Sequence, residues 1–163
     1  MFFPEKNKNL QKIEQLLLEN YNSYYRLAYS YVHNEADAFD IVQTGACKAI
    51  SNSSSLKKKE FAATWIYRIM LNEIFRFIQQ GTCISLDDIG MEEGKKDQYE
   101  DIDLKRALDN MQPKDKAVIE LKYFEELTFE EIAEILEENI NTIKSRLYRG
   151  LKKLKLELSD TSQ

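Results

Sequence analysis

The sequence predicts an all-α protein built from two small helical domains joined by an acidic linker. Only five Gly and two Pro interrupt its 163 residues. Apolar residues recur at spacings of three and four, and runs of alternating β-branched residues are missing from the sequence. The linker is placed by its charge, because residues 81–103 hold eight acids against two lysines, a net charge of −6.

The first expected domain, residues 1–80, begins with a tyrosine-rich helical segment over residues 10–32. Its apolar residues keep helical spacing, and an interruption near Asn20 to Asn22 is compatible with that spacing. An aromatic stripe on a helix is typical of core packing, and the alternative is a surface for a partner. The tyrosines concerned are Tyr21, Tyr24, Tyr25, Tyr29 and Tyr31.

A second helix is expected over residues 35–50. Asn34, with Asp37 three residues on, has the pattern of a helix N-terminal cap. The apolar stripe of this helix leaves Asp40 and Gln43 more outward. These two polar side chains are therefore candidates for contact with a partner.

A polar loop with three consecutive lysines, residues 51–59, leads into a further helix over residues 61–80. That helix is apolar on more than one face, which indicates either central burial or aromatic side chains presented to a ligand. Basic side chains beside aromatic rings are the parts of a single-strand nucleic-acid platform, and simple core packing is the alternative. The candidates are Lys57, Lys58, Lys59, Trp65, Tyr67, Arg68, Asn72 and Arg76.

The second expected domain, residues 104–163, follows the acidic linker as a unit of four helices. Three glycines and many polar residues predict that residues 81–103 are flexible. The apolar spacing from Leu104 to Met111 indicates the first helix of the domain. Pro113 favours the first turn of the next, which runs to about Phe124.

The remaining residues predict a helix-turn-helix motif. Thr128 and Glu131 have the pattern of a capping box at the start of its first helix. Asn141 or Thr142 is the expected N-cap of its second helix, and the asparagines of the turn tolerate a left-handed φ. Gly150 costs about 1 kcal/mol against alanine inside a helix, and a close backbone crossing explains its presence.

The charge changes sign within this motif. Residues 125–138 hold seven glutamates and no basic residue, whereas residues 141–155 hold six basic residues and no acid. The second helix of such a motif enters the DNA major groove, and a solvated basic face is the alternative. The candidates for base and phosphate contact are Asn141, Thr142, Lys144, Ser145, Arg146, Tyr148 and Arg149.

The composition argues against membrane and disulfide-bonded classes. No apolar run approaches the ~18 residues that span a bilayer, and the N-terminus lacks the apolar core of a signal peptide. Cys47 and Cys83 match no metal-ligand or redox spacing, so two reduced thiols are expected. We therefore expect a cytoplasmic protein with no membrane insertion, no cofactor and no catalytic residues.

Two other functional classes fit parts of the sequence. His33 with Glu35, Asp37 and Asp40 is a candidate metal site of an enzyme, but a surface histidine at a helix end is the simpler interpretation. The other alternative is a stand-alone helix-turn-helix regulator. It predicts a stable homodimer and a palindromic operator.

Three motifs, in this order, resemble the sigma-70 family of bacterial transcription initiation factors, in its two-domain extracytoplasmic function (ECF) branch. Residues 38–43, AFDIVQ, are similar to the family's A-x-D-x-x-Q. Residues 65–72, WIYRIMLN, are similar to W-L-Y-R-I-x-x-N, and residues 142–147, TIKSRL, to T-V-K-S-R-L. The resemblance extends over about residues 24–158.

The resemblance implies a factor that binds core RNA polymerase and directs it to promoters with particular −35 and −10 elements. It implies that Asp40 and Gln43 dock on the β′ clamp helices and that Lys57 to Lys59 and the helix from Trp65 to Arg76 hold the melted −10 strand. The second domain would read the −35 duplex through Lys144, Ser145, Arg146 and Arg149 and touch the β flap. Capture by an anti-sigma factor is also implied.

Some positions depart from the family pattern. At the end of the long helix Arg76 replaces an acid, and Gln79 and Gln80 replace a basic pair. Gly45 and Ala46 stand where a triplet containing Phe is usual. Residues 137–138 are both glutamate where a Gly or Asn and an apolar residue shape the turn. These departures bear on how the protein melts or holds DNA and on which promoter it reads.

Overall fold

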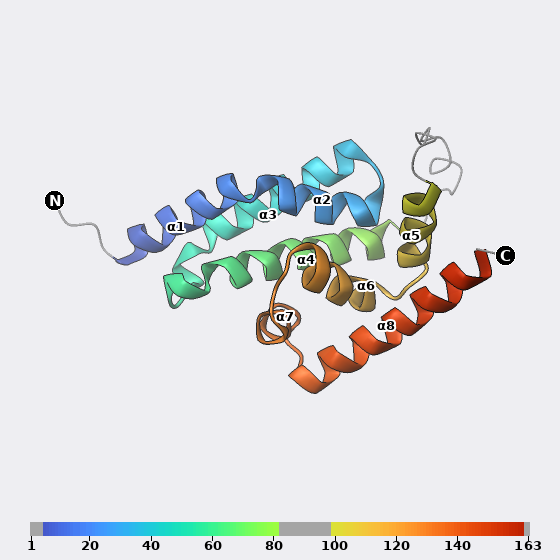
Figure 1. Ribbon diagram of the computed structural model, residues 1–163. Helices are drawn as coiled ribbons and strands as arrows, with labels where there is room; N and C mark the ends of the chain where they lie inside the picture. The colour runs from blue at the N-terminus through green and yellow to red at the C-terminus, as the bar shows by residue number, and fades with distance from the viewer. Residues whose placement is uncertain (1–4, 82–98, 162–163) are drawn as a thin grey trace. The chain divides into compact units, whose positions relative to one another are not determined.

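The computed structural model describes the backbone of residues 5–81 and 99–161 and the side chains of residues 8–81 and 103–159 (Figure 1). These residues form helices and no strand, so the predicted all-α class is confirmed. The chain divides into two compact units, Met1–Thr82 and Cys83–Gln163. Most of the predicted linker, with Cys83, lies outside the described residues, but helix α5 occupies its last five positions.

The first unit consists of α1 (Glu5–Glu19), α2 (Tyr21–Val32), α3 (Glu35–Ser51) and α4 (Ala62–Gln80). The tyrosine-rich segment is interrupted at Asn20, within the stretch that the sequence indicates, and α1 begins earlier than predicted. Asn34 caps α3 as predicted, because its side chain accepts a hydrogen bond from the backbone N–H of Asp37 at 2.9 Å. Two short 3₁₀ turns, Ser53–Ser55 and Lys59–Phe61, form part of the lysine loop.

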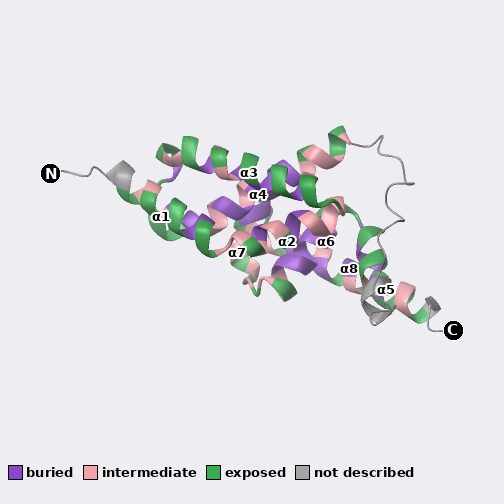
Figure 2. Ribbon diagram, turned by 90° about the horizontal axis from the view of Figure 1, so that it is seen from above, coloured by how far each residue is buried: buried purple, intermediate pink, exposed green. Residues whose placement is uncertain are grey.

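Helix α4 lies at the centre of the first unit and contacts the other three helices. Figure 2 shows buried residues along it, and Ile66 and Ile74 are fully buried. Gly45 of α3 lets this helix approach closely, since a Cβ at that position would lie 2.5 Å from Met70 Sδ. The glycine that departs from the family pattern thus serves the packing of α3 on α4.

The tyrosines of α2 divide between core and surface. Tyr24 is buried, and its ring meets the ring of Tyr67 edge-on, with centroids 5.3 Å apart. Tyr67 therefore belongs to the core, in line with the alternative of core packing for this helix. Tyr21, Tyr25 and Tyr29 stack on one another along a half-buried face of α2, with centroid separations of 6.4 and 6.1 Å.

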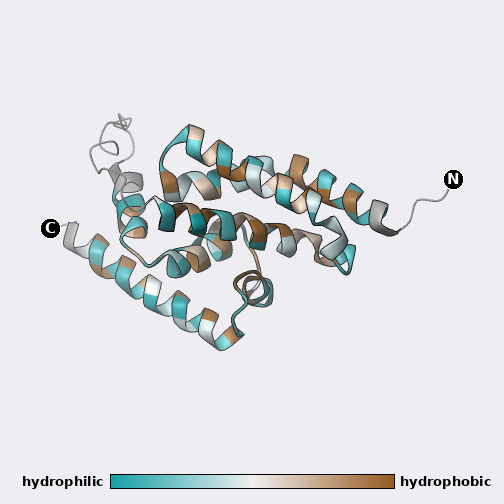
Figure 3. Ribbon diagram, turned by 180° about the vertical axis from the view of Figure 1, so that it is seen from behind, coloured by the Kyte–Doolittle hydropathy of each residue, from teal (hydrophilic) through white to brown (hydrophobic). Residues whose placement is uncertain are grey.

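The second unit consists of α5 (Tyr99–Asp109), α6 (Pro113–Ile119), a π-helical turn (Glu120–Phe124), α7 (Phe129–Leu136) and α8 (Ile140–Thr161). Pro113 occupies the first turn of α6, as predicted. Helix α8 packs against α5, α6 and α7. Its apolar stripe is buried at Ile143, Leu147 and Leu154, and Figure 3 shows hydrophobic and hydrophilic residues alternating along the helix.

The predicted helix-turn-helix is present as α7, a short turn and α8. The capping box is confirmed: Glu131 N–H donates to Thr128 Oγ1 at 3.1 Å, and Thr128 N–H donates to Glu131 Oε1 at 2.9 Å. The asparagines do not supply the left-handed residue of the turn, because Glu137 adopts it with a φ of 57°.

The N-cap of α8 is Asn139, not Asn141 or Thr142 as predicted. Asn139 Oδ1 accepts a hydrogen bond from Thr142 N–H at 2.8 Å, and Asn139 O accepts one from Ile143 N–H at 3.1 Å. Helical hydrogen bonding has therefore begun before the two expected caps, which lie inside the first turn.

Gly150 marks the close crossing that its position in a helix predicts. A Cβ at this position would lie 2.8 Å from Ile119 Cδ1, so α8 approaches α6 closely there and alanine would require the end of the Ile119 side chain to shift. The crossing fixes the second helix of the motif against the core of its unit.

Candidate nucleic-acid interfaces

The first turns of α8 carry the candidate residues for duplex DNA. Two of the seven, Thr142 and Arg146, are half-buried. The side chains of Tyr148 and Arg149 are prominent, with 65% and 60% of their surfaces exposed. The exposed candidates are Asn141, Lys144, Ser145, Tyr148 and Arg149.

The sequence predicts that Arg146 faces outward, but in the structure its guanidinium is bound by two carboxylates. Its Nε and Nη2 donate to the two oxygens of Glu138 at 2.7 and 2.9 Å, and its Nη1 donates to Asp115 Oδ1 at 2.9 Å. Only 16% of the side chain is exposed. The expected outward position was wrong because two carboxylates, one from the turn and one from α6, hold the guanidinium against the unit.

The ion pair between Arg146 and Glu138 keeps both groups charged. Hydrogen bonding from Arg146 is the main reason that the pKa of Glu138 lies below its usual range, although burial opposes the shift. Hydrogen bonding to Glu138 likewise raises the pKa of Arg146, again against the effect of burial. Lys114 adds a weaker contact with Glu138 at 3.6 Å.

Asp115, which the sequence analysis did not single out, is bonded to two of the candidate arginines. It lies in α6, and 5% of its surface is exposed. It accepts from Arg146 and also from Arg149, whose Nε and Nη2 lie 3.1 and 3.3 Å from its two oxygens. No sequence pattern could have identified it, because Asp115 is 31 and 34 positions from the arginines that it binds.

Lysines and an aromatic ring meet beside α8. The ammonium of Lys122 lies 4.5 Å from the centroid of the Phe129 ring, and that of Lys144 lies 5.6 Å from it. Two positive charges therefore converge on one ring at the start of α7. This places Lys144 at the edge of a basic area that also includes Lys122.

The second candidate interface lies on α4. Trp65, Arg68, Asn72 and Arg76 are spaced three, four and four residues apart, so they share one face of the helix, opposite the buried one. Asn72 and Arg76 are exposed, while Trp65 and Arg68 are half-buried. Arg76 Nη1 lies 3.5 Å from the buried Glu73. Lys57, Lys58 and Lys59 are exposed in the loop that precedes this helix.

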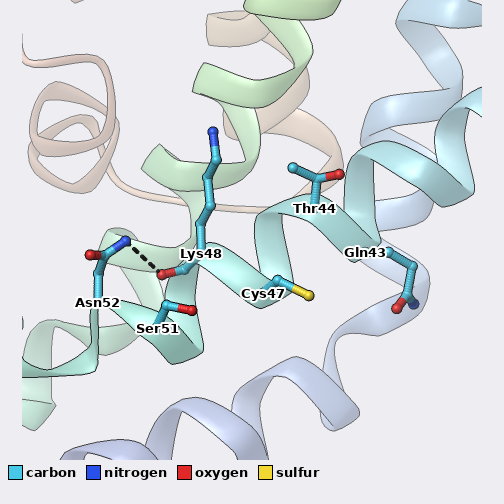
Figure 4. A pocket seen from close by; sticks show the side chains of 6 residues that line it. All are labelled: Gln43, Thr44, Cys47, Lys48, Ser51 and Asn52. Atoms are coloured by element: carbon cyan, nitrogen blue, oxygen red, sulfur yellow. Dashed lines mark hydrogen bonds between the residues drawn. The ribbon is translucent and has the colours of Figure 1, made fainter.

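Asp40 and Gln43 are both exposed on α3, as the sequence predicts. Asp40 lines an open hollow with Tyr25 and Phe39. Gln43 lines a second hollow, whose residues are drawn in Figure 4. In that view Gln43 and Cys47 lie on one side of α3, while Lys48 extends toward α4, where it pairs with the buried Glu73.

The residues of the alternative metal site do not converge. Within the described parts of the chain, no group of three or more His, Cys, Asp and Glu side chains could hold a metal ion. His33 instead meets the ring of Tyr29 edge-on, with centroids 6.3 Å apart. The described helices include none that is long and apolar enough to cross a membrane.

Comparison with known proteins identifies the two units. The pattern of sigma-70 region 2 matches residues 16–82, and that of sigma-70 region 4 matches residues 101–154. The RNA polymerase sigma factor SigV of Bacillus subtilis (strain 168) is 41% identical over 147 residues, which cover 88% of this chain and 89% of that protein. This chain belongs to the sigma-70 family.

Further relatives place the sigma factor in the ECF branch. The ECF RNA polymerase sigma factor SigW of Bacillus subtilis (strain 168) is 30% identical over 155 residues, with 83% of each chain covered. The chain is therefore an ECF sigma factor, a transcription initiation factor of a non-catalytic family. A stand-alone dimeric regulator is not favoured.

Two solved structures share the fold of the sigma factor. One is the sigma factor RpoE in complex with the anti-sigma factor NepR from Bartonella quintana, with a TM-score of 0.72, 24% identity, and coverage of 90% of this chain and 96% of that chain. The other is CnrH in complex with the cytosolic domain of CnrY, with a TM-score of 0.74, 18% identity and 95% of each chain covered.

Proposed function

We propose that this sigma factor engages core RNA polymerase through α3, holds a melted −10 strand on α4 and reads a −35 duplex with α8. The single observation that carries the assignment is the presence of two separate basic faces on two compact units, each unit matching the corresponding sigma-70 region. One face combines basic, amide and aromatic side chains, and the other lies on the second helix of a helix-turn-helix.

The −35 assignment is supported by the exposed polar side chains at the start of α8. Lys144 and Arg149 supply positive charge, and Ser145 and Tyr148 supply hydrogen-bonding groups. Asn141 and Thr142 lie in the first turn of the helix, where the positive end of the helix dipole favours a phosphate. Arg146 would brace the helix rather than contact a base, because three of its five N–H groups donate to carboxylates.

The −10 assignment is supported by the shared face of Trp65, Arg68, Asn72 and Arg76. An indole ring offers a stacking surface to an unpaired base, and arginine stacks on bases as well as attracting phosphate. The exposed lysines at positions 57–59 precede this face in the chain and would guide the strand backbone toward it.

The polymerase assignment is supported by the exposed polar residues of α3. Asp40 offers a carboxylate beside the half-exposed ring of Phe39, and Gln43 follows one turn later. Together they suit a partner helix with basic and apolar side chains, which we assign to the β′ clamp helices of the polymerase. We assign contact with the β flap to the second unit.

An anti-sigma factor is a further proposed partner. The two solved structures of the same fold are complexes with an anti-sigma factor and with the cytosolic domain of CnrY. The stacked tyrosines of α2 and the ring of Phe39 provide apolar surface for such a protein. We further propose that the sigma factor acts in the cytoplasm, where core polymerase meets promoter DNA.

The decisive test is transcription with purified components. The full chain is mixed with bacterial core RNA polymerase and genomic DNA, and the 5′ ends of the transcripts are sequenced. We expect start sites that share two upstream elements and that disappear when the sigma factor is omitted. A protein that binds DNA but yields no start sites with core polymerase would refute the proposal.

A further inference from the structure

Asp115 joins the two arginines of α8 through one buried carboxylate. Its Oδ1 accepts from Arg146 Nη1 at 2.9 Å and from Arg149 Nη2 at 3.3 Å, and its Oδ2 accepts from Arg149 Nε at 3.1 Å. The side chain of Asp115 is 6% exposed, whereas that of Arg149 is 60% exposed. The buried carboxylate of Asp115 therefore binds the inner edge of the Arg149 guanidinium, whose other edge faces outward.

The contact with Asp115 determines which part of Arg149 remains available. A guanidinium carries five N–H donors, and Asp115 takes one on Nε and one on Nη2. Among the described residues Arg149 donates to no other acceptor. The remaining edge, formed by Nη1 and Nη2, presents two parallel N–H groups, the arrangement that matches O6 and N7 of a guanine in the major groove.

Arg146 fixes the carboxylate rather than competing for DNA. Three of its donors are bound by Glu138 and Asp115, and its side chain is 16% exposed. Because Glu138 belongs to the turn and Asp115 to α6, Arg146 ties the start of α8 to both. Asp115 consequently has a fixed position from which to orient Arg149.

We propose, on the basis of the proposed role of α8 at the −35 element, that Asp115 is a specificity-determining positioning residue, which orients Arg149 toward one guanine-containing base pair. A long arginine side chain free to rotate can satisfy its donors on any nearby phosphate. An arginine whose Nε edge is bound by a carboxylate can donate two parallel hydrogen bonds only where the groove presents two acceptors opposite its other edge. Asp115 thereby converts a general cationic contact into recognition of one base pair.

The test is a selection with the full chain and core RNA polymerase. A promoter mapped with the wild-type protein is randomised over its −35 region and transcribed in a single round. The templates that yielded transcripts are then sequenced. Two variants are compared with the wild-type protein. Asp115→Asn keeps the size of the side chain but removes its charge. Arg149→Lys keeps the positive charge but removes the guanidinium and its paired N–H donors. The matched control is Glu138→Gln, which makes the same change of charge in the same network but contacts Arg146 and Lys114 rather than Arg149.

The wild-type protein is expected to favour a guanine-containing pair at one position by about tenfold or more. Asp115→Asn and Arg149→Lys should both lose that preference at the same position and keep the others, while Glu138→Gln keeps all of them. A general loss of stability would weaken transcription from every template and would not flatten a single position.

Retention of every preference by Asp115→Asn overturns the inference. If thermal unfolding shows that Asp115→Asn does not fold, Arg149→Lys decides, since Arg149 is largely exposed, and an unchanged motif with that variant also overturns it. Transcripts with no selected −35 motif from the wild-type protein would instead refute the proposed function of α8, and the inference with it.

Discussion

Arg146 and Glu138 form a side-on ion pair, with Nε to Oε1 at 2.7 Å and Nη2 to Oε2 at 2.9 Å. Both side chains are 16% exposed, so the pair is shielded from water on most of its surface. It joins the turn of the helix-turn-helix to the second helix. The angle at which α8 presents its basic face therefore depends on an interaction between charged groups as well as on the apolar stripe beneath it.

Replacing Arg146 with alanine is expected to lower the free energy of unfolding of the second unit by about 3 kcal/mol, because Glu138 loses its main partner and Asp115 loses one of its two arginines. Urea unfolding followed by far-UV circular dichroism measures the loss. The fluorescence of Trp65, the only tryptophan, reports on the first unit and should keep its midpoint. Lys152→Ala, an exposed change on the same helix, should cost less than about 0.5 kcal/mol.

The pair also predicts a dependence of stability on pH. Since the pKa of Glu138 is lowered below its ordinary value of 4.5, chiefly by hydrogen bonding from Arg146, its contribution is complete above that pH and is lost as the pH falls further. The difference in unfolding free energy between the wild-type protein and Glu138→Gln should therefore be largest near neutral pH and shrink in acid. A difference that stays constant from pH 7 to about pH 3 would contradict the role of this pair.

Glu126 offers a stabilising substitution. It adopts a left-handed φ of 57°, which is unfavourable for residues other than glycine. Glu126→Gly is expected to raise the free energy of unfolding by roughly 0.5–1 kcal/mol. Glu130→Gly is the matched control, because Glu130 lies within α7, where glycine should lower stability by a similar amount. Thermal unfolding compares the two variants, and destabilisation by both would show that strain at Glu126 is unimportant.

Trp65 is expected to contribute to promoter melting by stacking on an unpaired base. Trp65→Ala should reduce transcription from a duplex promoter by about 5- to 100-fold, the range for loss of one stacked base. The control is Leu18→Ala, which truncates an exposed side chain of α1 and leaves the side chains of α4 unchanged. Single-round transcription compares the variants, and equal output from the Trp65→Ala and wild-type proteins would remove this residue from the −10 interface.

Asp40→Lys is expected to prevent capture of core RNA polymerase, since it reverses the charge at the centre of the proposed α3 surface. The fold should be preserved because the side chain is exposed. A pull-down with core polymerase measures the effect, which should exceed tenfold. Glu14→Lys makes the same charge reversal on the exposed face of α1 and should retain capture. Equal capture by both variants would place the docking surface elsewhere.

Local patterns of the sequence were sufficient for most of the helices. The cap of α3 at Asn34, the capping box of Thr128 and Glu131, and Pro113 at the start of α6 all act within a few residues, so their chemistry is visible in the chain. The predictions for the turn and the cap of α8 were wrong because several neighbouring residues can take the same position. Asn139, rather than Asn141, caps α8, and Glu137 takes the left-handed position that an asparagine was expected to fill.

The sequence by itself determined the all-α class, the family motifs and the segregation of basic residues onto the second helix of the motif, because helical periodicity and charge are local properties. Tertiary structure decided which of those side chains are available. Tyr67 is buried against Tyr24, and Arg146 is held by two carboxylates. Contacts between residues 31 and 43 positions apart depend on how the helices pack, and spacing along the chain does not specify that packing.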